Sequence, residues 1–166
     1  GAKVQKVPLV ENGETGDQWK AGLIERFSGA FSKGAVKVMS IPWCTTSTGH
    51  ILPARELCAL ARRNGAIAVI DATQLFAVQP LDFADVGCDF LVMNGHKYLG
   101  GPIGSGFIVA RQESVAEPDF FPTIVDTNVY GGRGYHPCSK GGIMPYTNVL
   151  PVLDAIEFYR ELQPEH

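Results

Sequence analysis

The sequence predicts an α/β fold, a mostly parallel β-sheet flanked by helices. Three short runs of continuously apolar residues, at 66–71, 89–94 and 106–110, are typical of strands that are covered on both faces of a parallel sheet. Segments with helical periodicity alternate with the strands of the first half, which is the pattern of β–α–β units. We therefore expect both faces of this sheet to be covered.

The first ten residues place apolar Val4, Val7 and Leu9 among polar ones, which predicts a strand already under way where the chain starts. A complete domain generally begins with a looser end. We therefore expect the chain to be the central piece of a longer protein.

Two helices are predicted in the first half of the chain. The first, over 17–31, begins at Asp17, a residue type that favours the N-cap position. The second, over 53–63, has Pro53 at its start and Asn64-Gly65 at its end, which are the usual signals for both ends of a helix. Their apolar faces are formed by Trp19, Leu23, Ile24 and Phe27 in the first helix and by Leu57, Leu60 and Ala61 in the second.

A further strand and a C-terminal helix complete the prediction. The β-rich run at 35–41 ends at Pro42, and residues 113–145 are rich in Gly, Pro and aromatic residues, which is typical of loops. Residues 148–162 repeat apolar side chains at helical spacing, with Pro151 in the first turn. The apolar face of this helix comprises Val149, Val152, Leu153 and Ile156.

We divide the chain into residues 1–115, the main α/β part, and residues 116–166, a loop followed by a helix. The 166 residues are enough for one domain with a sizeable core. A net charge of −3 and a pI near 5.8 give no basic patch for nucleic acid or an anionic membrane. No apolar run approaches the roughly 18 residues that a membrane-spanning helix requires.

The four cysteines have no C-x-x-C spacing and no metal-finger pattern, so we expect reduced thiols in a cytoplasmic protein and no metal site. Cys58 and Cys88 lie in apolar segments and are expected in the core. Cys138 lies in the predicted loop. A reactive thiol is an alternative interpretation of this residue, but its position in a loop is the only feature in favour of it.

Polar residues follow three of the predicted strands, in SIPWCTTSTG, IDATQ and MNGHK. Ligands of open α/β sheets bind outside the carboxyl ends of the strands. Asp71 ends a fully apolar strand, where a carboxylate is costly to desolvate without a cationic or hydrogen-bonding partner. A protonated heterocycle nitrogen is such a partner, and a simple strand terminus is the alternative. Gln74 leaves the same turn, and taken alone it is typical of a surface residue.

Lys97 follows the third apolar run directly. Lysine is rarely buried unless it is paired or functional. A desolvated lysine can lose its proton near neutral pH and attack a carbonyl to form a Schiff base. A solvated lysine in a turn is the alternative.

The glycines after Lys97, in GGPIGSG, allow a third interpretation, a loop whose backbone N–H groups bind a phosphate. A P-loop, however, places its lysine after the glycines, and no G-x-G-x-x-G occurs here. A strand follows these glycines where both nucleotide motifs require a helix. The glycines more plausibly serve the return to the next strand.

The combination of Asp71, Gln74 and Lys97 resembles the class V aminotransferase family, which are pyridoxal-phosphate (PLP) enzymes of fold type I. The resemblance covers nearly the whole chain and is greatest to the branch of isopenicillin-N-epimerase-like proteins and cysteine desulfurases. The matching segments are TTSTGHILP (45–53), DATQ (71–74), GCDFLVMNGHKYLGGPIGSGFIV (87–109), the opening GAKVQKVPL and the closing GGIMPYTNVLPVLDAIEFY.

The resemblance implies that residues 1–115 are the central part of a PLP-binding large domain. It implies that Lys97 forms a Schiff base with the cofactor and later moves protons at the substrate Cα. Asp71 would pair with the pyridinium nitrogen, which makes the ring an electron sink. Gln74 would hydrogen-bond the phenolic oxygen of the ring.

Three further residues gain roles by the same resemblance. His96 and Asn94 would lie near the cofactor phosphate, and Thr46 near the ring or the substrate. Serine is frequent at the position of Asn94. His50, His136 and His166 match no family motif and are expected to be surface or loop residues.

Two departures from the family are apparent. Threonine is common where Ile143 stands, and isoleucine offers no hydroxyl for a phosphate in the partner subunit. The regions that carry the main phosphate-binding turn, the aromatic residue that stacks on the ring and the arginine for the substrate carboxylate are not within these residues.

The implied function is a PLP enzyme, an epimerase, lyase or aminotransferase, that acts on an amino acid as a homodimer. No position suits a desulfurase nucleophile, which favours an epimerase or a lyase. A non-catalytic fragment or binding module that retains the α/β scaffold is the alternative. The loop DFFPTIVDTNVY is expected to contact the partner subunit of the homodimer, and packing against its own subunit is the alternative.

Overall fold

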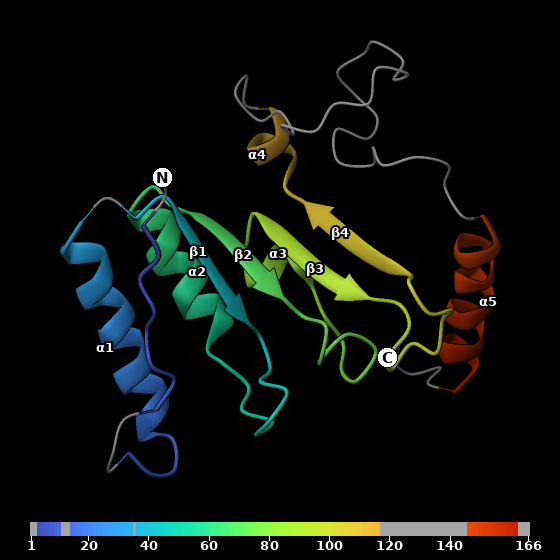
Figure 1. Cartoon of the computed structure of the whole chain (residues 1–166), viewed down its shortest axis with the longest axis horizontal. Helices are drawn as coiled ribbons and strands as arrows, with labels where there is room; N and C mark the ends of the chain where they lie inside the picture. The colour runs from blue at the N-terminus through green and yellow to red at the C-terminus, as the bar shows by residue number, and fades with distance from the viewer. Residues whose placement is uncertain (1–2, 11–13, 35, 117–145, 163–166) are drawn as a thin grey trace.

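The computed structural model describes residues 3–10, 14–34, 36–116 and 146–162 (Figure 1). Its sheet has the order β1-β2-β3-β4, in which β1 pairs with β2 and β2 with β3 in parallel, while β4 pairs antiparallel with β3. The predicted mostly parallel α/β architecture is therefore confirmed. The strands are β1 (Val38–Pro42), β2 (Ile67–Asp71), β3 (Phe90–Asn94) and β4 (Gly106–Ala110).

Five helices are described: α1 (Gln18–Ser32), α2 (Ala54–Arg63), α3 (Phe83–Val86), α4 (Gln112–Ala116) and α5 (Tyr146–Leu162). Asp17 occupies the N-cap position of α1 without a capping hydrogen bond, and its carboxylate lies 3.4 Å from the Lys20 ammonium. Asn64 and Gly65 end α2 as predicted, because the Asn64 N–H donates to the last helical carbonyls and Gly65 adopts a φ of +67°.

The core lies between the sheet and the helices on one of its faces. The predicted apolar faces of α1 and α2 are confirmed: Trp19 and Leu23 are buried, Ile24 and Phe27 pack against the core, and the three predicted residues of α2 are buried. The strands contribute Met39 and Ile41, Ala68 and Ile70, and Leu91 and Met93 to the same core.

The expectation that both faces of the sheet are covered is wrong for the described residues. Alternate residues of β2 are open to solvent, with Ile67 40% exposed and Val69 half-buried. Consecutive right-handed crossovers that advance in one direction place their helices on the same face. In agreement, α2 packs on β2 and contacts both α1 and α3 (Figure 1).

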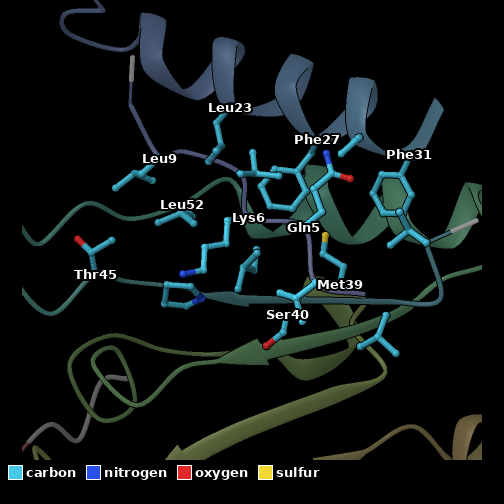
Figure 2. Close-up of a pocket in the computed structure, with 17 residues that line it drawn as sticks. Gln5, Lys6, Leu9, Leu23, Phe27, Phe31, Met39, Ser40, Thr45 and Leu52 are labelled. Atoms are coloured by element: carbon cyan, nitrogen blue, oxygen red, sulfur yellow. The ribbon is translucent and has the colours of Figure 1, made fainter. Parts of the chain in front are cut away.

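The predicted N-terminal strand is also not observed. Residues 3–10 run without strand pairing, and the Arg26 guanidinium holds them to α1 by donating to the carbonyls of Pro8 and Leu9. This segment, α1 and β1 together line a cavity of about 470 Å³ (Figure 2). No described strand pairs with the segment, and β1 is the edge of the described sheet.

The C-terminal helix begins two residues earlier than expected, so Pro151 lies in its second turn and not in its first. Of its predicted apolar face only Val152 is buried, while Val149 and Leu153 are exposed and Ile156 is half-buried. The helix lies beyond β4 in Figure 1, and the Asn148 side chain donates to the carbonyl of Ile103 at 3.0 Å.

Cys58 and Cys88 are buried, as predicted. Burial raises the pKa of the Cys58 thiol to about 12 and that of the Cys88 thiol to about 11. Both are therefore neutral core residues near pH 7, where the reactive thiolate is almost absent. No helix within the described residues is long and apolar enough to cross a membrane.

The two isoleucines of β2 test this arrangement directly. Ile70 is 0% exposed and Ile67 is 40% exposed. We expect Ile70→Ala to lower the free energy of unfolding by about 2–5 kcal/mol, because it removes buried methyl groups and leaves a cavity. Ile67→Ala, the matched control in the same strand, should cost less than half as much. Equal losses in urea denaturation would show that the face opposite α2 is buried as well.

Candidate active site

The register of the parallel strands gathers the predicted site residues at one edge of the sheet. Pro42 pairs with Asp71, and Asp71 pairs with Val92, two residues before Asn94. The carboxyl ends of β1, β2 and β3 are thus adjacent. Thr46 lies in the turn after β1, Gln74 in the turn after β2, and Lys97 in the turn after β3.

Asp71 is held by its backbone and by the turn that follows it. Its carbonyl accepts the Trp43 N–H at 2.8 Å, and its Oδ1 accepts the Thr73 N–H at 2.9 Å. Its side chain is exposed, and Oδ2 has no hydrogen-bond partner within the described residues. One carboxylate oxygen is therefore fixed while the other can accept a hydrogen bond from outside.

Thr46 and Gln74 are in direct contact, although 28 residues separate them in the sequence. The Gln74 side-chain amide donates to the Thr46 hydroxyl at 3.0 Å. This bond joins the turn after β1 to the turn after β2 and sets the orientation of the Gln74 amide. It is the one hydrogen bond between two of the six predicted site residues in the part of the chain described here.

Lys97 is exposed, and its side-chain amine has no hydrogen bond or ion pair to another described residue. Among the described residues the solvated alternative fits Lys97, and a desolvated amine stays a prediction. His96 is also exposed, and its Nδ1 donates to the Ser105 carbonyl at 3.2 Å. Asn94, at the end of β3, is half-buried and pairs with Gly106 of β4.

The glycine-rich turn uses its own backbone N–H groups. Gly95 donates to the Ser105 carbonyl at 3.0 Å, Gly100 to Lys97 at 3.0 Å, and Gly101 to Gly95 at 2.8 Å. These groups close the turn from β3 into β4, and they are not free to cradle a phosphate. The interpretation of the glycines as a tight return between strands agrees with this geometry, and the nucleotide-loop alternative does not.

His50, which matches no family motif, is half-buried in the loop after β1. Its Nδ1 lies 2.6 Å from the Thr48 hydroxyl, and its ring meets the Trp19 ring edge-on at 5.0 Å between centroids. It lies in a loop, as expected, but it is not a plain surface residue. The sequence signal for this contact is the segment TTSTGH, in which four hydroxyl residues and a glycine directly precede His50.

The cavity in Figure 2 is not at this edge. It is lined by residues 4–7 and 9, by one face of α1 and by β1 with the start of the next loop. Thr45 lines it, but none of the six predicted site residues does. No group of three or more His, Cys, Asp or Glu within the described ranges could hold a metal ion.

Four residues considered in the sequence analysis lie outside the described residues: Ile143, Cys138, His136 and His166. The loop DFFPTIVDTNVY lies outside them as well.

The chain belongs to the class V aminotransferase family, because the sequence profile described as Aminotransferase class-V matches residues 1–122. A probable cysteine desulfurase 2 of Mycobacterium leprae is 44% identical over 108 residues, which are 63% of this chain and 26% of the relative. An isopenicillin N epimerase of Amycolatopsis lactamdurans is 44% identical over 63 residues, 38% of this chain and 16% of the relative.

The fold is also similar to solved structures of a cysteine desulfurase and an aminotransferase. A cysteine desulfurase from Thermococcus onnurineus NA1 superposes with a TM-score of 0.68 at 21% identity, over 84% of this chain and 36% of that one. A pyridoxamine-pyruvate aminotransferase from Mesorhizobium loti gives a TM-score of 0.66 at 22% identity, over 86% and 38%. The chain therefore has part of the large-domain fold of fold type I PLP enzymes, and it spans about a quarter or less of its curated relatives.

Two glycines test the role of the turn. A Cβ on Gly101 would lie 2.8 Å from the backbone oxygen of Gly95, whereas a Cβ on Gly29, inside α1, would meet nothing within 4 Å. We expect Gly101→Ala to destabilise the chain. Gly29→Ala should stabilise it by about 0.5–1 kcal/mol, because alanine favours the helix. Thermal melts that shift the same way for both variants would contradict the tight closure of the turn.

Proposed function

We propose that the protein to which these residues belong is a PLP-dependent enzyme that acts on an amino acid. Membership of the class V aminotransferase family is the observation that carries the proposal. The site supports it with three complementary groups at one edge: a carboxylate with an unengaged oxygen, an oriented amide and an unpaired amine. When bound, PLP supplies an electron sink that stabilises negative charge at the substrate Cα.

The residues of this edge fit the cofactor by their chemistry. Asp71 would accept the N–H of the protonated ring nitrogen through its free oxygen and keep that proton in place by its charge. Gln74, oriented by its bond to Thr46, would donate its second amide hydrogen to the phenolic oxygen. Asn94 and His96 would contact the phosphate with side-chain donors.

Lys97 would hold the cofactor covalently and, when released, would carry a proton to or from the substrate Cα. An unpaired amine on a short turn can serve both purposes, because it has no ion pair to give up among the described residues. For general base work near pH 7 the amine would have to be desolvated in the complete site.

The reaction is proposed to be an epimerisation, a lyase reaction or a transamination. The names of the relatives include a cysteine desulfurase, an isopenicillin N epimerase and a 2-aminoethylphosphonate–pyruvate transaminase, the last 33% identical over 81 residues. These reactions share proton movement or bond cleavage at or next to an amino-bearing carbon. We further propose a cytoplasmic homodimer.

Covalent attachment at Lys97 tests this function. The longer protein should be incubated with PLP, reduced with borohydride and digested, and the peptides analysed by mass spectrometry. We expect one pyridoxyl group per chain on the peptide that contains Lys97, and none in Lys97→Ala. Lys37→Ala, which removes a lysine at the opposite end of β1, is the control and should keep full labelling. Labelling elsewhere, or none, would refute the proposal.

The exposure of Lys97 also motivates an alternative, in which the 166-residue chain by itself is a non-catalytic fragment or binding module. The same reduction on the isolated chain separates the two. Stoichiometric labelling with turnover would exclude the alternative, whereas labelling of the longer protein alone would support it for the isolated chain.

A further inference from the structure

The loop at residues 45–50 is closed by three backbone-directed hydrogen bonds. The Thr45 N–H donates to the His50 carbonyl at 3.0 Å, and the Gly49 N–H donates to the Thr45 carbonyl at 3.0 Å. The His50 N–H donates to the Thr45 hydroxyl at 2.9 Å. Gly49 has a φ of +68°, a conformation that glycine adopts without strain. The backbone of this loop is thereby tied at both ends.

The His50 ring adds a second closure through side chains. Its Nδ1 lies 2.6 Å from the Thr48 hydroxyl, which lies 2.7 Å from the Thr45 hydroxyl. A hydroxyl both donates and accepts, so the chain of bonds is satisfied whether Nδ1 donates or accepts. The ring, Thr48 and Thr45 therefore lock one another in one arrangement.

The same ring connects the loop to the core. Trp19, in the first turn of α1, is only 8% exposed, and its ring meets the His50 ring at 5.0 Å and an interplanar angle of 88°. Aromatic rings prefer edge-to-face arrangements of this kind, so the contact favours one orientation of the His50 ring. His50 is thus held on one side by a fixed core residue and on the other by the loop.

Thr46 lies inside this loop, and its hydroxyl is the acceptor for the Gln74 amide at 3.0 Å. Thr46 is exposed and Gln74 is half-buried, so neither is held in place by tight packing. We propose that His50 is a positioning residue, which fixes loop 45–50 and thereby the Thr46–Gln74 pair. The inference rests on the proposed function, because that function makes Thr46 and Gln74 part of the cofactor site.

The two contacts of His50 can be separated by substitution. Asparagine can place a polar atom near the position of Nδ1 but has no aromatic edge, whereas phenylalanine keeps the edge and loses the hydrogen bond. Thr48→Val removes the hydroxyl without touching His50. Ser47→Ala is the matched control, because Ser47 is exposed in the same loop and has no hydrogen bond within the described residues.

Three readouts should be compared in the longer protein. Hydrogen exchange of the peptide covering residues 45–50 reports the loop. The side-chain amide signal of Gln74 in ¹⁵N-glutamine-labelled protein, assigned by its loss in Gln74→Glu, reports the pair. The dissociation constant for PLP reports the cofactor.

We expect His50→Phe and Thr48→Val to speed exchange and weaken PLP binding by about fivefold each, since a lost hydrogen bond is worth about 1 kcal/mol. Both should shift the Gln74 signal, while His50→Asn should retain more of the wild-type behaviour and Ser47→Ala should retain all of it. An unmoved Gln74 signal in His50→Phe and Thr48→Val would overturn the inference. Failure of the wild-type protein to bind PLP would overturn the proposed function, and the Gln74 signal would still decide the role of His50.

Discussion

Parallel hydrogen-bonded pairing of β1, β2 and β3 determines which residues of this chain can act together. It sets Pro42 opposite Asp71 and Asp71 opposite Val92, so the three turns that follow these strands leave the sheet at one edge. Because side chains alternate between the two faces of a strand, a slip of one residue in β2 would expose Ala68 and Ile70 and bury Asp71. The apolar core thus fixes the register, and the register fixes the site.

The described residues form a sheet with helices on one face. Helices α1, α2 and α3 cover one face of the sheet, while Ile67 on the other face is open and a cavity runs along the free edge of β1. Lys97 is likewise uncovered. The chain spans about a quarter or less of the two curated relatives named above. Residues 3–10 likewise have no strand partner among the described residues.

Local signals in the sequence were sufficient for most of the fold. Apolar runs bounded by turn residues located β2, β3 and β4, and the pair Pro53 and Asn64-Gly65 located both ends of α2. The wrong predictions concern contacts between segments that are distant in the sequence. Periodicity does not describe the neighbours on which coverage of the second face and pairing of residues 3–10 depend. For the site, the ends of the predicted strands identified Asp71 and Lys97. The sequence alone does not predict the contact between Thr46 and Gln74 or the contacts of His50, because these join residues that are far apart in the sequence.

The proposed function depends most on Asp71, which would keep the ring nitrogen of the cofactor protonated from the carboxyl end of β2. The most direct measurement is the ¹⁵N chemical shift of ring-labelled PLP bound to the longer protein, compared with that in the Asp71→Asn variant. A carboxylate holds the nitrogen protonated and a neutral amide does not, so we expect a protonated shift in the wild type and a move toward the unprotonated value in the variant. The same shift in both proteins would contradict it.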